Sequence, residues 1–191
     1  MRKRIPWLLA LLALGLCVSG VILKFQEAIP KALIVLYTFQ SLILDMSGNT
    51  GTQSLGVTIR VLSDEQLDKK RIFRYILKEL RVGLCNGLVI GTLAFALVGC
   101  YLTFLTDSTA LHGAGFGFEV SACIGISLVC AMLIASFDGS VIPIVFKKIG
   151  IDPAVASGPL ITTVNDFVAV CTYYGLSLLL FVKTGLFSFA G

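Results

Sequence analysis

The sequence predicts an all-α integral membrane protein with five transmembrane helices. Of its 191 residues, 57% are hydrophobic and only 14% are charged, whereas a soluble domain carries roughly 25% charged residues. The hydrophobic residues form long runs, and most basic residues are clustered between those runs. This combination predicts helices that cross a bilayer, because a soluble fold of this length could not cover so much apolar surface.

Five apolar runs are long enough to cross the membrane. The expected helices cover residues 5–25, 32–62, 82–106, 119–146 and 154–183, and with an amphipathic connector over 63–81 they form a single domain over 1–191. The first run follows three basic residues, as in a cleaved secretory signal. We interpret it as a retained helix, because its length exceeds the roughly 7–15 apolar residues of a signal core.

The second run is unusual because polar residues interrupt it. Between Lys31 and Arg60 lie 28 residues whose one charge is Asp45. A single helix of that length would span about 42 Å at roughly 1.5 Å per residue, more than the ~30 Å hydrocarbon core. We expect this helix to tilt strongly, to extend into the cytoplasm, or to break near Gly48 and Gly51.

The connector over residues 63–81 is the most polar part of the chain. Ile72, Tyr75, Ile76 and Leu80 recur there at helical intervals among charged residues. This pattern is typical of an amphipathic segment at the membrane surface.

The basic residues also predict the orientation of the chain. With the N-terminus inside, the inner segments hold Arg2 to Arg4, the seven basic residues from Arg60 to Arg81, and Lys147 with Lys148. The outer segments hold only Lys24, Lys31 and Lys183. Because inner loops are enriched in Lys and Arg, the N-terminus is expected in the cytoplasm and the C-terminus outside.

Carboxylates inside the apolar runs are the strongest candidates for function, because each costs about 2.5–3.5 kcal/mol to insert at mid-helix. The candidates are Asp45, Asp138 and Asp166. Asp166 lies deepest in its run, with Thr162 and Thr163 four and three residues before it, so hydroxyls flank it on its own helix. A protonated carboxyl bonded within the bundle is the structural alternative.

A polar stripe marks the second run. Asp45, Asn49 and Gln53 recur every four residues and therefore share one helix face. Such a stripe either joins helices or lines a pore, and spacing alone does not separate the two. The carboxylate favours the pore, because helix packing rarely needs a full charge.

The inventory of carboxylates, amides and hydroxyls suits a hard cation such as Mg²⁺ or Ca²⁺. Copper and zinc would call for clustered Cys and His, which the runs lack. The chain has no nucleophile–base pair and no ATP motif, so an enzyme is not expected. Nucleic acid is an unexpected partner too, because the basic residues are not interleaved with aromatics along a polar face.

Three ordered motifs resemble one known family. Ser47 to Arg60, SGNTGTQSLGVTIR, is similar to the second membrane helix of the MgtE family of Mg²⁺ channels. Lys78 to Leu88, KELRVGLCNGL, resembles the entry to its third helix, and Ile142 to Phe167 resembles the junction of its fourth and fifth helices. The similarity covers essentially the whole chain and corresponds to the transmembrane domain only, without the family's cytoplasmic N-domain or CBS domains.

The resemblance implies a homodimer in the bacterial inner membrane, with one pore at the dimer interface lined by the second and fifth helices. The family's aspartate that holds hydrated Mg²⁺ falls on Asp166, and a backbone carbonyl one turn earlier falls on Thr162. With the polar stripe, the expected ion-binding residues are Asp166, Thr162, Asp45, Asn49 and Gln53.

The implied function is selective, passive transport of Mg²⁺, with the hydrated ion held by Asp166. The alternatives are a broader divalent channel that also passes Ca²⁺, Mn²⁺ or Co²⁺, and an antiporter that exchanges the cation for H⁺ or Na⁺. A membrane subunit without any flux is the remaining alternative, and the polar stripe would then serve only for packing.

Overall fold

The computed structural model describes residues 5–63, 68–105, 115–153 and 158–183. Within these ranges the chain forms long α-helices and short helical turns, with no strand. The elements in chain order are α1 (Ile5–Ala28), η1 (Lys31–Leu33), α2 (Val35–Leu62), α3 (Lys69–Phe104), α5 (Phe116–Lys148), α6 (Gly158–Ser177) and the π-helical turn η3 (Leu178–Lys183). The prediction of an all-α protein with five long helices is confirmed.

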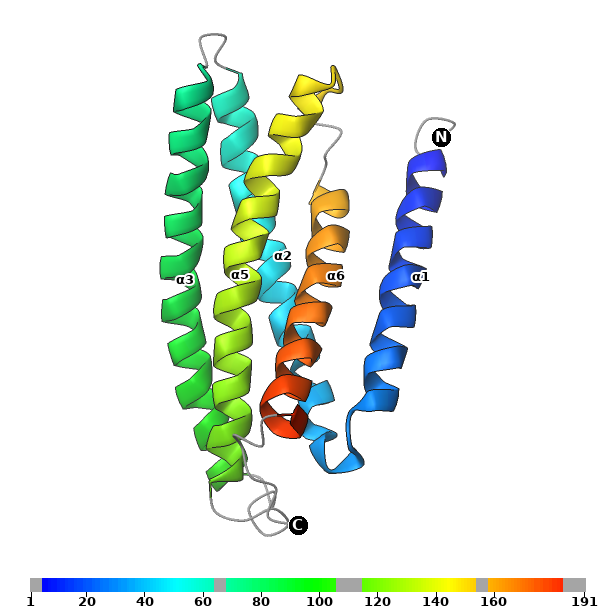
Figure 1. The fold of residues 1–191 in the computed structure, drawn as a ribbon, viewed down its shortest axis with the longest axis vertical. Helices are drawn as coiled ribbons and strands as arrows, with labels where there is room; N and C mark the ends of the chain where they lie inside the picture. The colour runs from blue at the N-terminus through cyan, green and yellow to red at the C-terminus, as the bar shows by residue number, and fades with distance from the viewer. Residues whose placement is uncertain (1–4, 64–67, 106–114, 154–157, 184–191) are drawn as a thin grey trace.

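The five long helices run up and down side by side (Figure 1). α1 begins at the end of the bundle where α2 and α5 finish and where α3 and α6 begin. α6 and η3 finish at the opposite end. The chain therefore crosses the length of the bundle an odd number of times.

Among the residues that the structure describes, four helical segments are long and apolar enough to cross a membrane: α1, α3, α5 and the stretch Gly158–Val182. α2 has 28 residues and lies within the same bundle, but its polar residues lower its hydropathy. We count α2 as the fifth span, because its length matches the others and it packs against α5 and α6.

α5 is the central helix of the bundle. It packs against α2, α3 and α6, and its buried side chains include Val120, Ile124 and Leu128. α1 differs from the other helices, because it packs against α6 and buries none of its residues. One of its contacts is Phe25, whose ring lies 5.6 Å from that of Tyr174.

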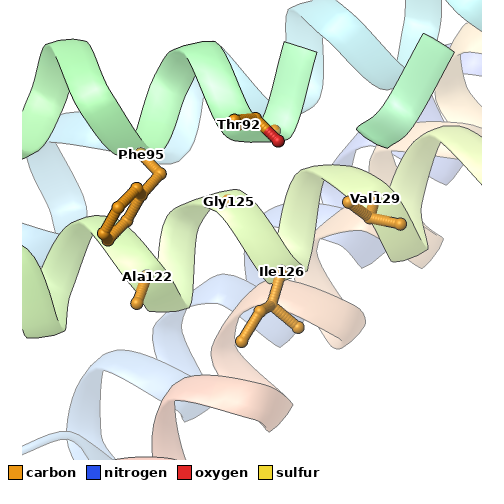
Figure 2. A pocket seen from close by; sticks show the side chains of 7 residues that line it. Thr92, Phe95, Ala122, Gly125, Ile126 and Val129 are labelled. Atoms are coloured by element: carbon orange, nitrogen blue, oxygen red, sulfur yellow. The ribbon is translucent and has the colours of Figure 1, made fainter. Parts of the chain in front are cut away.

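Small residues allow α3 to lie directly on α5. A Cβ added at Gly91 would lie 2.7 Å from the Gly125 carbonyl oxygen, and one added at Gly125 would lie 2.8 Å from the Gly91 carbonyl oxygen. The crossing is bordered by a shallow apolar groove of about 240 Å³ (Figure 2), lined by Thr92, Phe95, Ala122, Ile126 and Val129 besides these two glycines. Backbone contact of this kind is typical of membrane helices, whose association depends on close packing.

α2 and α5 cross in the same way nearer the other end of α5. A Cβ added at Gly139 would overlap the carbonyl oxygen of Gly51 and would lie 3.0 Å from the Ser54 Cβ. Since α5 also packs against α3, these two crossings set the positions of α2 and α3 relative to each other.

Tyrosines hold α6 to the beginning of α2. The Tyr173 hydroxyl donates a hydrogen bond of 2.7 Å to the Leu36 carbonyl oxygen, and the Tyr174 hydroxyl donates to Gln40 Oε1. The Tyr37 ring lies 5.9 Å from the Tyr174 ring in an edge-on arrangement. These contacts give polar groups in the bundle interior the partners that hydrocarbon cannot supply.

Two features differ from what the sequence suggests. The possible break near Gly48 and Gly51 does not occur, because α2 is continuous from Val35 to Leu62. The connector over 63–81 is not a separate segment either, because α3 runs without interruption from Lys69 to Phe104. That part of the chain contains no proline, and its glycines at 83, 87 and 91 are buried against α5, which offsets their low helix propensity.

Candidate ion-binding site

Asp166 lies in the middle of α6 and is half-buried. In the described part of the chain, no hydrogen bond or ion pair engages its carboxylate. The hydroxyls one turn away are already used within the helix. Thr162 Oγ1 donates to the Gly158 carbonyl oxygen at 3.0 Å, and Thr163 Oγ1 donates to the Pro159 carbonyl oxygen at 2.8 Å. Their oxygen lone pairs therefore remain free to accept hydrogen bonds beside Asp166.

α2 supports this part of α6 through small residues. A Cβ added at Gly48 would lie 3.5 Å from Thr162 Cγ2, and one added at Gly158 would lie 3.8 Å from Thr52 Cγ2. The two helices are antiparallel (Figure 1). The residue one turn before Gly48 on α2 therefore lies at the same height in the bundle as the residue one turn after Thr162 on α6.

This register brings Asp45 to the level of Asp166 on the neighbouring helix. Asp45 is exposed, and it precedes Gly48 by three residues, while Asp166 follows Thr162 by four. Three of the five sequence-predicted residues, Asp166, Thr162 and Asp45, therefore occur along one pair of helices. They offer carboxylate and hydroxyl oxygens at the middle of the bundle.

The structure places Asn49 and Gln53 on a different side of α2. Both side chains are exposed, and they line a cavity of about 390 Å³ between α2, α3 and α5. Its other polar contributors are Thr50 and Asn86. Within one subunit, Asp45 of the polar stripe is therefore level with Asp166 of α6, whereas Asn49 and Gln53 lie at the cavity beside α3.

Asp138, the third carboxylate inside an apolar run, is half-buried on α5. It lies next to Gly139, the residue that packs against α2. In the described ranges no ion pair involves Asp138.

Asn165 is a buried polar residue whose role the sequence does not indicate. Its side chain is 1% exposed and lies against Gly51, where any Cβ would overlap its Nδ2. Neither amide atom has a hydrogen-bond partner among the described residues. Asn165 therefore faces α2. Asp166 follows it directly in α6, so the two side chains point to different sides of the helix.

Glu79 is a second residue that sequence reasoning missed. It is buried on α3, and the Ser54 hydroxyl of α2 donates a hydrogen bond of 3.0 Å to its Oε2. A signal was present: Tyr75, Glu79 and Gly83 follow one another at four-residue intervals. That spacing places the carboxylate on the same face of α3 as its buried glycines.

The described residues contain no group of three or more His, Cys, Asp or Glu side chains that could hold a metal ion directly. Isolated carboxylates with neighbouring hydroxyls and amides instead suit an ion that keeps its water shell, as Mg²⁺ commonly does. The fold and the site together define an integral membrane protein with acidic positions suited to a hard cation.

Comparison with known proteins identifies the family. The model of the MgtE family, described as a divalent cation transporter, matches residues 40–176. The chain belongs to this transporter family, and it is a multi-pass membrane protein.

Three relatives, each called magnesium transporter MgtE, are similar over almost the whole chain. The Bacillus subtilis protein is 39% identical over 175 residues and the Enterococcus faecalis protein 38% identical over 175 residues, in both cases 92% of this chain. The Thermus thermophilus protein is 33% identical over 177 residues, or 93% of this chain. The aligned part is 36% of each relative's length, so the chain spans about a third of those proteins.

Proposed function

We propose that this chain forms the membrane pathway of a Mg²⁺ channel, which passes the ion down its electrochemical gradient and holds it in hydrated form at Asp166. The observation that carries the proposal is the half-buried Asp166 carboxylate, with no counter-charge in the described chain, in the middle of an apolar helix. An ionised group in that position is expensive unless it faces water or a cation. The relatives named as magnesium transporters support Mg²⁺ as the ion.

Passive transport is sufficient for a dication. A negative interior favours entry by about 2.3 kcal/mol per charge for each 100 mV. With the N-terminus in the cytoplasm, the C-terminal ends of α2 and α5 would lie on the inner side. There Lys147 Nζ donates a hydrogen bond to the Leu62 carbonyl oxygen. The clustered basic residues support this orientation.

Flux into proteoliposomes separates the candidate functions. We expect Mg²⁺ to enter along its own gradient without a gradient of H⁺ or Na⁺. Entry of Ca²⁺, Mn²⁺ or Co²⁺ at a similar rate would establish the broader divalent channel, which the family description also allows. Flux that requires an opposing H⁺ or Na⁺ gradient would establish an antiporter, and absence of any flux would contradict transport by the membrane part alone.

We expect the purified chain to be a homodimer. A single subunit leaves Asp45, Asn49 and Gln53 exposed on α2, which in hydrocarbon costs several kcal/mol for unsatisfied polar groups. A two-fold axis beside α2 and α6 would place Asp45, which is level with Asp166, opposite its copy around shared water, while Asn49 and Gln53 would remain at the groove beside α3. Light scattering or native mass spectrometry in detergent should give twice the mass of the chain. A conducting protein of monomeric mass would contradict the dimer and the shared pore.

Asp45→Asn should lower the rate of Mg²⁺ entry at low Mg²⁺ concentrations by roughly three- to ten-fold, because the exposed carboxylate raises the local cation concentration. The fold should be unaffected, since Asp45 makes no hydrogen bond or ion pair in the described structure. Initial rates of entry at several Mg²⁺ concentrations measure the effect. The matched control is Asp68→Asn, an exposed carboxylate just before α3 without a side-chain capping bond; equal effects of both changes would show that Asp45 contributes only general surface charge.

A further inference from the structure

Glu79 is a buried carboxylate without a cationic partner. Its side chain is 7% exposed, and no Lys, Arg or His forms an ion pair with it in the part of the chain that the structure describes. Its position ten residues into α3 puts it near the end of the bundle where α2 finishes. Glu79 takes no part in the contacts around Asp166 described above.

The Glu79 carboxylate accepts a hydrogen bond from α2. Ser54 Oγ donates to Oε2 at 3.0 Å. The Tyr75 hydroxyl donates instead to Thr58 Oγ1 at 2.8 Å, because the Thr58 hydroxyl hydrogen is already donated to the Ser54 carbonyl oxygen. Burying a carboxylate away from water is costly unless hydrogen-bond donors or a positive charge accompany it. One hydrogen bond and no ion pair accompany Glu79 in the described residues.

Glu79 lines part of a polar groove between α2, α3 and α5. It lines a cavity of about 130 Å³ with Thr50, Gln53, Ser54, Asn86 and Ser136. The cavity of about 390 Å³ that Asn49 lines shares Thr50, Gln53 and Asn86 with it. The two cavities therefore adjoin along the same three residues, and their polar walls consist of one carboxylate, amides and hydroxyls.

The size of the groove and its oxygen ligands indicate the kind of ion. Six waters around a small cation occupy about 180 Å³ at roughly 30 Å³ each. That volume fits the larger cavity and exceeds the smaller one. Carboxylate and amide oxygens suit hard cations, and Mg²⁺ in particular retains its waters.

We propose that the groove between α2, α3 and α5 binds a hydrated divalent cation in its larger cavity, where Gln53 and Asn86 accept hydrogen bonds from its waters. Glu79, which lines the adjoining smaller cavity, supplies the nearby negative charge. This site is separate from Asp166, because Gly48 and Gly51 of α2 contact α6 while Gln53 faces the groove. The inference goes beyond the proposed channel function and concerns one further ion-binding site in each subunit.

Binding of Mn²⁺ tests the site independently of transport. Mn²⁺ is a hard divalent cation, and its free concentration is measured by electron paramagnetic resonance. The full chain carrying Asp45→Asn and Asp166→Asn lacks the carboxylates on the α2–α6 side. We expect this double variant to bind about one Mn²⁺ per chain, and we expect Mg²⁺ to displace it at far lower concentration than Na⁺.

Adding Glu79→Gln to the double variant should weaken Mn²⁺ binding at least about ten-fold. The glutamine keeps the shape of the side chain and an oxygen for the Ser54 hydrogen bond. The matched control is Glu119→Gln, which removes a half-buried carboxylate from the first turn of α5 at the other end of the bundle. That change should leave Mn²⁺ binding unaltered.

Asn86→Leu provides a second test that retains the Glu79 charge. Asn86 is exposed at the groove, so an apolar replacement is compatible with the fold but narrows the space for a water shell. It should weaken Mn²⁺ binding several-fold, and it decides the question if Glu79→Gln does not fold. The proposal is overturned if the double variant binds no Mn²⁺, if neither groove substitution weakens binding, or if Na⁺ displaces Mn²⁺ as readily as Mg²⁺ does. None of these results would contradict the proposed transport through the Asp166 site, which is tested separately by flux measurements on the unmodified chain.

Discussion

Asp166→Asn is expected to remove the discrimination between divalent and monovalent cations. In a symmetric dimer two Asp166 carboxylates would face each other across the pore, and together they would balance one Mg²⁺. The substitution keeps the size of the side chain and removes both charges. Divalent binding should weaken by about 100-fold or more, in keeping with a loss of at least ~2.7 kcal/mol, and Na⁺ or K⁺ should pass.

The physical reason is the way in which Mg²⁺ is held. Mg²⁺ keeps its waters at about 2.0–2.1 Å and exchanges them reluctantly, so the carboxylates would accept hydrogen bonds from those waters. Thr162 and Thr163 have their hydroxyl hydrogens committed to α6 backbone carbonyls. Their oxygens would therefore also act as acceptors and could not replace the lost negative charge.

Mg²⁺ and Na⁺ flux into proteoliposomes, measured over a range of Mg²⁺ concentrations, checks this expectation. Asp138→Asn is the matched control, because it removes another half-buried carboxylate from an apolar helix. Asp166→Glu retains the charge and should have a milder effect, since its longer side chain narrows the pore. If Asp166→Asn conducts Mg²⁺ with unchanged affinity and still excludes Na⁺, the selectivity site lies elsewhere.

Gly139→Val is expected to destabilise the bundle by about 3 kcal/mol or more. Overpacking a well-packed interior usually costs about 1–3 kcal/mol, and here the added Cβ would overlap a backbone carbonyl, that of Gly51, which cannot rotate away. α5 would have to move away from α2. Because Gly51 also packs against Asn165, α6 would lose part of its support as well.

Thermal unfolding in detergent, followed by the loss of monodisperse protein on gel filtration, measures this effect. Gly56→Val is the matched control: it makes the same change within α2, at a glycine where an added Cβ meets nothing within 4 Å. The control should stay close to the wild-type stability. Equal stability of the two variants would show that the α2–α5 contact does not limit the stability of the bundle.

The sequence by itself determined the class of protein, the number of long helices and the candidate carboxylate at Asp166. These features follow from local composition. A long run without charge is stable across a bilayer wherever it occurs, and a lone carboxylate within such a run is costly whatever its neighbours are. The motifs from Ser47 to Arg60 and from Ile142 to Phe167 indicated the family for the same reason, since they are contiguous in the chain.

The tertiary structure decided which side of α2 each polar residue occupies. A four-residue spacing places Asp45, Asn49 and Gln53 along one stripe, but it does not say which helices border that stripe. Gly48, Gly51 and Thr52 contact α6, and Gly139 of α5 meets Gly51. Asn49 and Gln53 are consequently left at the groove beside α3.

Only the tertiary structure showed the place of Glu79. Its sequence surroundings are those of a surface segment, with Lys78 and Arg81 close by. The carboxylate is buried because α3 continues past the charged residues as one helix and because Gly83, four residues later, lies against Ser136 of α5. Close approach of two helices depends on residues from both, and a single segment of sequence contains only one side of that contact.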